Sequence, residues 1–258
     1  MKQESEVMIL IRAVYLTVLY MFVGILVNTV AAMASMDFYL AHPMLWTFLS
    51  AVITMPFCLI QMKTDGYLEC EREQKKRPKR DWLLLILLGS SSCIALNYWI
   101  GLSGLMEIFT GFDKVAETIY TGNLLEEVLA IVLAAPIVEE LLFRGLAYRG
   151  FRRLWNPWVA WIISSLFFGI YHRNVVQGLY AFLIGMLLVY VYERFGTLLA
   201  CIVFHMAANA VSVLLTECVD MSWVYRNLGT ELGFTLFFTI VSVLSFVMLH
   251  RGRKKPEV

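Results

Sequence analysis

Long apolar runs separated by short polar segments dominate the pattern along this chain. A membrane-spanning helix needs about 20 predominantly apolar residues. Runs of about this kind lie at residues 8–34, 44–62, 82–104, 123–148, 157–172, 175–192, 197–216 and 231–250. The first run is too long for a signal peptide and precedes seven others, so we expect the protein to retain it. The pattern predicts an all-α, polytopic integral membrane protein with about eight transmembrane helices.

The distribution of lysine and arginine predicts how these helices are oriented. An even number of spans places both termini on the same side, and Lys and Arg accumulate in cytoplasmic loops. With both termini inside, only Lys114, Arg173 and Arg226 of the 21 Lys and Arg residues fall outside. The sequence therefore predicts cytoplasmic termini.

The longest polar stretch, residues 63–81, divides the chain into two predicted parts. Residues 1–81 would form a two-helix N-terminal membrane hairpin plus a basic cytoplasmic linker, and residues 82–258 a six-helix membrane core. The composition, 60% hydrophobic and 16% charged, compares with about 25% charged residues in soluble domains. The formal net charge of +1 gives no bias toward nucleic acid, so we expect the lipid bilayer and no nucleic acid as a partner.

Charged residues occur within the apolar run at 123–148, where a charge costs about 2.5–3.5 kcal/mol to insert. Glu139 and Glu140 are adjacent and therefore point about 100° apart on a helix, whereas Glu140 and Arg144 share one face. We predict that Arg144 neutralises Glu140 and that Glu139 faces a cavity as a general base. A buried charge network that only holds helices together is the alternative.

Two histidines and an asparagine supply the other polar groups of the apolar runs. His172 ends the fifth predicted span, four residues after Phe168, and His205 and Asn209 share a face of the seventh. Each histidine alone would more often be a packing residue, but together with the carboxylates they suit acid–base hydrolysis. Helix geometry places Glu139 and His205 roughly 12–15 Å from the cytoplasmic boundary and His172 roughly 20 Å from it. We expect a cavity open to the cytoplasm.

Three motifs in order along the chain resemble one known family. They are EExxxR at 139–144, FxxxH at 168–172 and HxxxN at 205–209. The trio is similar to the CAAX-processing and bacteriocin-processing (CPBP, or Abi) intramembrane endopeptidases. The resemblance covers about residues 120–215, and the first 120 residues carry no assignable motif.

The resemblance implies a role for each motif residue. Glu139 would activate water, and His172 and His205 would position the water or the substrate. Asn209 would assist the oxyanion. The supporting residues would be Glu140, Arg144 and Phe168.

The resemblance leaves the cofactor open. The zinc-protease pattern HExxH is absent, yet Glu139, His172 and His205 could form a His₂Glu metal site. We therefore expect either no required cofactor or one zinc ion.

The resemblance also implies a class of substrate. It would be a membrane-associated peptide or protein, such as a leader, pheromone or bacteriocin precursor, with a CAAX-type sequence as the family's eukaryotic case. The compact chain resembles bacterial members, which predicts the bacterial cytoplasmic membrane and a bacteriocin-immunity role. The alternative is a non-enzymatic protein, either an immunity factor that acts by binding or a transporter that uses the Glu/His cluster as a proton relay.

Overall fold

The computed structural model describes residues 5–68, 77–109, 111, 116–117, 119–120 and 123–252. Part of the basic linker and part of the segment 105–122 lie outside these residues. The described elements are all helical: α1 (Glu6–Ala34), α2 (Met36–Ala41), α3 (Pro43–Thr64), α5 (Lys79–Leu102), α6 (Leu105–Ile108), α8 (Leu124–Glu127), η1 (Val128–Ala134), α9 (Ala135–Glu140), η2 (Leu141–Tyr148), α10 (Arg149–Leu154), α11 (Pro157–Tyr171), α12 (Val175–Phe195), α13 (Leu198–Val213), η3 (Leu214–Cys218), η4 (Val224–Arg226) and α14 (Leu228–Arg251).

The prediction of an all-α polytopic membrane protein is confirmed. Within the described residues, six helices are long and apolar enough to cross a membrane: α1, α3, α5, α12, α13 with η3, and α14. The apolar helix α11 is shorter, and the fourth predicted span is built from four consecutive short segments, α8, η1, α9 and η2. The count of eight spans stays a prediction.

The fourth predicted span differs from a regular helix in two places. Its segments η1 and η2 are π-helical, with α9 between them. Pro136 stands at the start of α9 and has no backbone N–H to donate. Short π-helical segments are frequent at functional sites, and these two lie on either side of Glu139 and Glu140.

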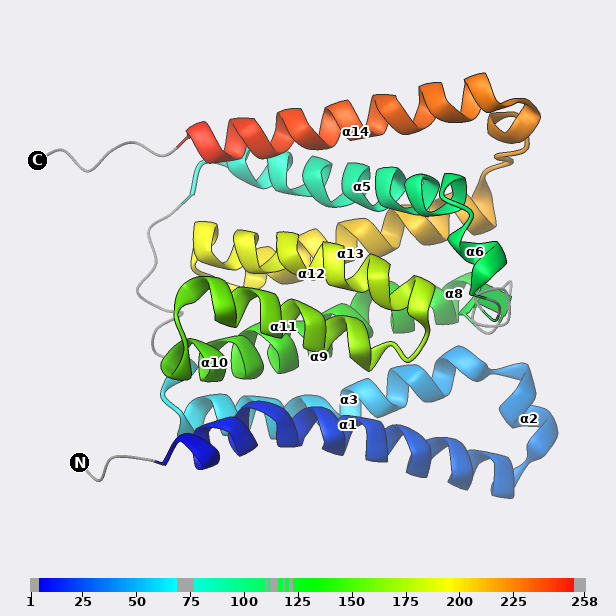
Figure 1. Ribbon diagram of the computed structural model, residues 1–258. Coiled ribbons are helices and arrows are strands. Elements are labelled where there is room, and N and C mark those ends of the chain that lie inside the picture. Colours follow the sequence, from blue (N-terminus) through cyan, green and yellow to red (C-terminus); the bar gives the residue numbers. More distant parts are fainter. Residues whose placement is uncertain are drawn as a thin grey trace, which may run out of the picture.

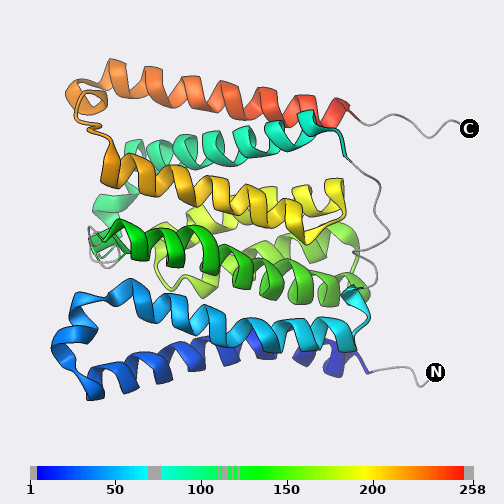
Figure 2. The ribbon, with the colours of Figure 1, turned by 180° about the vertical axis from the view of Figure 1, so that it is seen from behind.

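The long helices lie side by side, and α1 begins at the end of the bundle where α14 ends (Figures 1 and 2). Contacts between distant segments define this end: Arg12 pairs with Asp65 at 3.2 Å, and Arg149 Nη1 donates to Tyr67 O at 2.7 Å. We call it the basic end, since it carries Arg12, Lys63, Arg77, Lys79, Arg80, Arg149, Arg152, Arg153, Arg194 and Arg251.

The opposite end of the bundle is formed by α2, α6, α8 and the turn before α14 (Figure 1). Among the described Lys and Arg residues, Arg173 and Arg226 lie toward this end. The start of α1 and the end of α14 thus lie on the same side of the bundle, as an even number of spans requires. That this side is cytoplasmic stays a prediction from the charge distribution.

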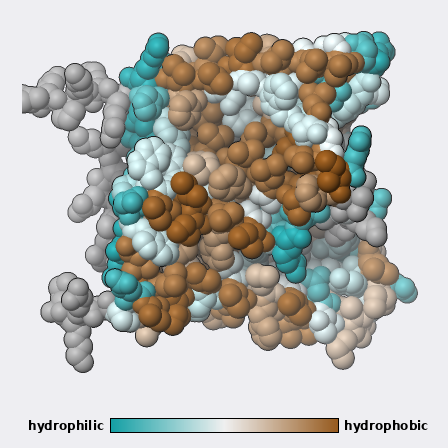
Figure 3. All heavy atoms as spheres, in the orientation of Figure 1, coloured by the Kyte–Doolittle hydropathy of each residue, from teal (hydrophilic) through white to brown (hydrophobic). Residues whose placement is uncertain are grey.

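Large apolar side chains cover the sides of the bundle. Figure 3 shows broad hydrophobic areas between its two ends, and α1 and α14 expose residues such as Phe22, Ile25, Phe237 and Ile240. A soluble protein rarely exposes such continuous apolar surface. The sides therefore face lipid, and the protein is a multi-pass membrane protein.

Candidate functional site

Glu140 connects three helical segments at the centre of the bundle. Its Oε1 accepts hydrogen bonds from Arg144 Nη1 and from His205 Nδ1, both at 2.8 Å. Glu140 and Arg144 are fully buried, and Arg144 Nη2 also donates to Gly185 O at 3.3 Å. The structure contains the Glu140–Arg144 pair expected from the four-residue spacing, and adds His205, which the sequence did not connect to it.

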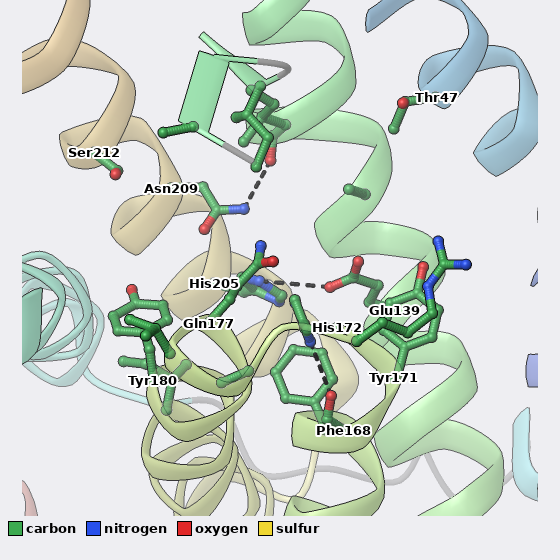
Figure 4. Close-up of a pocket in the computed structure, with 18 of the residues that line it drawn as sticks. Thr47, Glu139, Phe168, Tyr171, His172, Gln177, Tyr180, His205, Asn209 and Ser212 are labelled. Atoms are coloured by element: carbon green, nitrogen blue, oxygen red, sulfur yellow. Dashed lines mark hydrogen bonds and ion pairs between the residues drawn. The ribbon is translucent and has the colours of Figure 1, made fainter. Parts of the chain in front are cut away.

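Glu139 lies on the other side of the same histidine. Its Oε2 is 3.8 Å from His205 Nε2, and its side chain lines a cavity (Figure 4). Because Nδ1 of His205 donates to Glu140, the ring is held with Nε2 toward Glu139. The two adjacent carboxylates thus have different surroundings: Glu140 Oε1 accepts from two donors in the packed interior, whereas Glu139 lines the cavity.

His172 lies beside Glu139 and His205 in the cavity wall (Figure 4). Its Nδ1 donates to Phe168 O at 2.9 Å, and since a carbonyl only accepts, Nε2 of the neutral ring is left as an acceptor. The Phe168 ring packs edge-on against both His172 and His205, with centroids 4.9 and 5.9 Å apart. The FxxxH spacing therefore fixes the imidazole by a backbone bond and an aromatic contact.

Asn209 is engaged in a backbone contact one turn beyond His205. Its Nδ2 donates to Ile131 O at 2.8 Å. In a π-helix each N–H bonds to the carbonyl five residues earlier, as the Ala135 N–H does to Ala130 O. In the same register the N–H of residue 136 would donate to Ile131 O, but Pro136 has no N–H. Asn209 supplies the missing donor, which leaves its second N–H for the cavity.

The cavity has a volume of about 650 Å³. Residues outside the three sequence motifs also line it. Tyr20 of α1 stacks on Tyr171 of α11 beside Glu139, with ring centroids 6.1 Å apart. Gln177 and Tyr180 of α12 lie across from them (Figure 4). Sequence reasoning missed these residues because a tyrosine or glutamine in an apolar run carries no motif.

The cavity occupies the half of the bundle away from the basic end. Asn28 near the end of α1, Thr47 near the start of α3 and Ser212 near the end of α13 all line it. On the other side of the two carboxylates the bundle is packed: Met62, Leu142, Leu198 and Cys201 are buried there. The expected cytoplasmic cavity and the expected cytoplasmic termini are therefore incompatible, since the cavity lies away from the end that carries the termini.

Glu139, His172 and His205 are also the residues that would hold a zinc ion. Their donor types suit a His₂Glu site, and both histidines have Nδ1 fixed by an acceptor, as metal-ligating histidines usually do. Across the residues that the structure describes, however, no group of three His, Cys, Asp or Glu is arranged as a ligand set. The arrangement of these three side chains does not fit a zinc ion.

The comparisons with known proteins agree with the position of the three motifs. The family described as Type II CAAX prenyl endopeptidase Rce1-like matches residues 121–211. An Escherichia coli protein described as "Uncharacterized 24.3 kDa protein" is 34% identical over 91 residues, which are 33% of this chain and 42% of that protein.

A second relative covers more of the chain at lower identity. It is the "Putative membrane peptidase YdiL" of Bacillus subtilis (strain 168), 24% identical over 180 residues, or 66% of this chain and 71% of that protein. No solved structure matches the chain. The three motifs of this chain lie within residues 121–211, and over these residues the chain is similar to the family of CAAX-type proteases.

Proposed function

We propose that the protein is an intramembrane endopeptidase that hydrolyses a peptide bond with water activated by Glu139. The observation that carries this proposal is the arrangement around His205, where one carboxylate fixes the ring and a second carboxylate is left facing a cavity. A structural charge network would have no need for a second carboxylate that contacts His205 Nε2 at 3.8 Å and lines a cavity. The similarity of residues 121–211 to the CAAX prenyl endopeptidase family supports the same reaction.

Glu139 would act first as a general base and then as a general acid. It takes a proton from a water molecule, and the water oxygen attacks the carbonyl carbon of the peptide bond. The same proton then passes to the nitrogen of the leaving amine as the C–N bond breaks. One carboxylate therefore completes the proton transfer, and the products are a carboxylic acid, which keeps the second proton of the water, and an amine.

The neighbouring groups would hold the water and the oxyanion. His172 Nε2 is an acceptor and can receive a hydrogen bond from the attacking water, while its Nδ1 stays bonded to Phe168 O. The second N–H of Asn209 is a donor at the cavity wall and can stabilise the oxyanion. A His205 ring protonated at both nitrogens would donate from Nε2 toward the Glu139 carboxylate, while its Nδ1 stays bonded to Glu140.

The substrate would be a membrane-associated peptide or precursor, such as a leader, pheromone, bacteriocin-type or CAAX-type sequence. The volume of about 650 Å³ is enough for a short peptide segment. Apart from Glu139, the histidines and Arg173, the described residues that line the cavity are uncharged. This surface suits an apolar or uncharged segment whose backbone amides are bound by neutral donors and acceptors.

The test compares peptides from cells that produce the intact protein, Glu139→Gln and His205→Ala at matched abundance. Mass spectrometry of membrane and secreted peptides should find products that occur only with the intact protein. An immunity factor that acts by binding predicts a phenotype that survives in Glu139→Gln, with identical peptide profiles. Such a result would remove the protease proposal.

A further inference from the structure

We propose that the substrate reaches Glu139 from the extracytoplasmic side of the membrane, through a water-filled cavity bounded by the outer half of α1. This inference rests on the proposed function for the identity of the substrate, but the direction of access is argued from geometry and charge alone. Three independent features carry it: the packing between the site and the basic end, the length of α11, and the charge at the two ends of the bundle.

Packed side chains close the route between the site and the basic end. A side-chain carbon added at Gly145, one residue beyond Arg144, would lie 3.0 Å from Met62 Sδ and 3.1 Å from Leu198 Cδ1. Met62 and Leu142 are essentially inaccessible, and Leu198 is 5% exposed. Interiors packed this closely exclude water. A peptide could not reach Glu139 from the basic end without separating α3, η2 and α13.

The short helix α11 indicates that water enters from the opposite end. Its 15 residues span about 22 Å at 1.5 Å per residue, which is less than the roughly 30 Å thickness of the hydrocarbon layer. The turn at His172, Arg173 and Asn174 therefore lies at membrane depth, well short of the opposite end of the bundle (Figure 1). Irregular backbone is tolerated at that depth only where it is buried in protein or lines a water-filled cavity.

This turn is polar and partly exposed. Arg173 is exposed, has a φ of 55° and lines the cavity. Figure 3 shows a hydrophilic area within the apolar side of the molecule, where Figure 1 places the turn between α11 and α12. A guanidinium at this depth requires water or another polar environment, and the cavity next to it provides one.

The outer half of α1 forms one wall of the cavity without closing it. Tyr20, Met21, Gly24, Ile25 and Asn28 recur on one face of the helix and all line the cavity. A side-chain carbon added at Gly24 would meet no atom within 4 Å. From Met21 to Ala34, only Ala31 is buried. This half of α1 is therefore the least packed boundary of the site.

The charge distribution gives the side of the membrane. Ten described Lys and Arg residues lie at the basic end and Arg173 and Arg226 toward the other end, and Lys and Arg mark the cytoplasmic side. The cavity thus opens on the extracytoplasmic side. The substrate would be an uncharged peptide segment in the outer leaflet or a peptide that arrives from outside the cell.

The experiment measures access without requiring catalysis. Single cysteines are introduced by Gly24→Cys and Asn28→Cys in the full-length chain with its five cysteines replaced by alanine, and Thr64→Cys at the exposed basic end of α3 serves as the matched control. Intact cells are treated with a membrane-impermeant maleimide. We expect labelling at positions 24 and 28 in intact cells, and at position 64 only after the membrane is permeabilised.

The opposite pattern would overturn the proposal, and so would unlabelled cysteines at positions 24 and 28 in intact cells. A second readout uses the substrate found with the intact protein: a bulky maleimide on Gly24→Cys, added from outside, should reduce cleavage at least tenfold relative to the same variant without reagent. If labelling is as expected but Glu139→Gln leaves the peptide profile unchanged, the direction of access stands and the protease assignment fails.

Discussion

Glu140 and His205 are joined across two helices by a hydrogen bond of 2.8 Å between Oε1 and Nδ1. The same oxygen accepts from Arg144 at 2.8 Å, so one buried atom fixes both the cation of η2 and the imidazole of α13. Glu139, the preceding residue in the chain, has only the 3.8 Å contact with His205 Nε2 and lines the cavity. Two adjacent glutamates are therefore expected to give different results when each loses its charge.

Glu139→Gln should abolish hydrolysis while leaving the fold intact. The side chain keeps its size and its place at the cavity, but an amide cannot accept the proton of the attacking water. General-base catalysis is worth about 10²–10⁴-fold, so the rate of product formation should fall by at least that order. Mass spectrometry of the products at matched protein abundance gives the loss, and thermal unfolding of the purified protein should match the intact chain.

Glu140→Gln should instead lower stability as well as activity. It leaves the buried Arg144 cation without its counter-charge, and breaking a buried ion pair costs about 3–5 kcal/mol. We expect a clearly lower unfolding temperature in detergent, where Glu139→Gln shows none. If Glu140→Gln unfolds like the intact protein, the buried pair does not contribute to stability as its geometry indicates.

Asn209 should have a structural effect that a second substitution can reverse. Asn209→Ala leaves Ile131 O without its part-buried donor, and the loss of such a hydrogen bond costs about 0.5–1.5 kcal/mol. Pro136→Ala restores the N–H that a π-helical register would direct to Ile131. The double variant Asn209→Ala with Pro136→Ala should therefore recover thermal stability relative to Asn209→Ala alone.

Activity separates the two roles of Asn209. If its second N–H also stabilises the oxyanion, the double variant recovers stability but still hydrolyses the substrate at least tenfold more slowly than Pro136→Ala alone. Full recovery of both properties would mean that Asn209 acts only through the backbone of η1. No recovery of stability would contradict the assignment of Ile131 as the carbonyl that lacks its N–H.

The sequence predicted local features well and the relative placement of helices poorly. The spacing of Glu140 and Arg144 was sufficient to predict their pair, because residues four apart on a helix are neighbours. The bond between Glu140 and His205 joins residues 65 positions apart, and no helical periodicity contains it. The end of the bundle toward which the cavity lies could not be predicted for the same reason: depth along each helix was predicted separately, whereas the position of the cavity depends on which end of the bundle is packed.

Zinc removal tests the cofactor that the sequence left open. If hydrolysis depends only on Glu139, His172 and Asn209, prolonged chelation should leave the rate of cleavage and the unfolding temperature unchanged. If Glu139, His172 and His205 hold zinc, chelation should abolish cleavage and added zinc should restore it, with zinc measured at one ion per chain in the purified protein. His172→Ala is the matched control, because it removes one candidate ligand and should lower bound zinc only in the second case.

Close helix contacts near His172 should make Gly169 intolerant of a side chain. A carbon added at Gly169 would lie 2.7 Å from Gly178 O and 3.2 Å from Phe182 Cβ, so Gly169→Ala must separate α11 from α12. We expect a loss of about 1–3 kcal/mol in stability, typical of overpacking, and reduced cleavage because His172 moves with α11.

Gly24→Ala provides the contrast for this variant, since the same carbon meets no atom within 4 Å at Gly24. Alanine is favoured over glycine within helices by roughly 0.5–1 kcal/mol, so Gly24→Ala should unfold at an equal or higher temperature than the intact protein. Thermal unfolding of both variants in one detergent measures the difference. Equal destabilisation by the two substitutions would mean that α11 and α12 are not in close contact at Gly169, or that the wall of the cavity at Gly24 is packed.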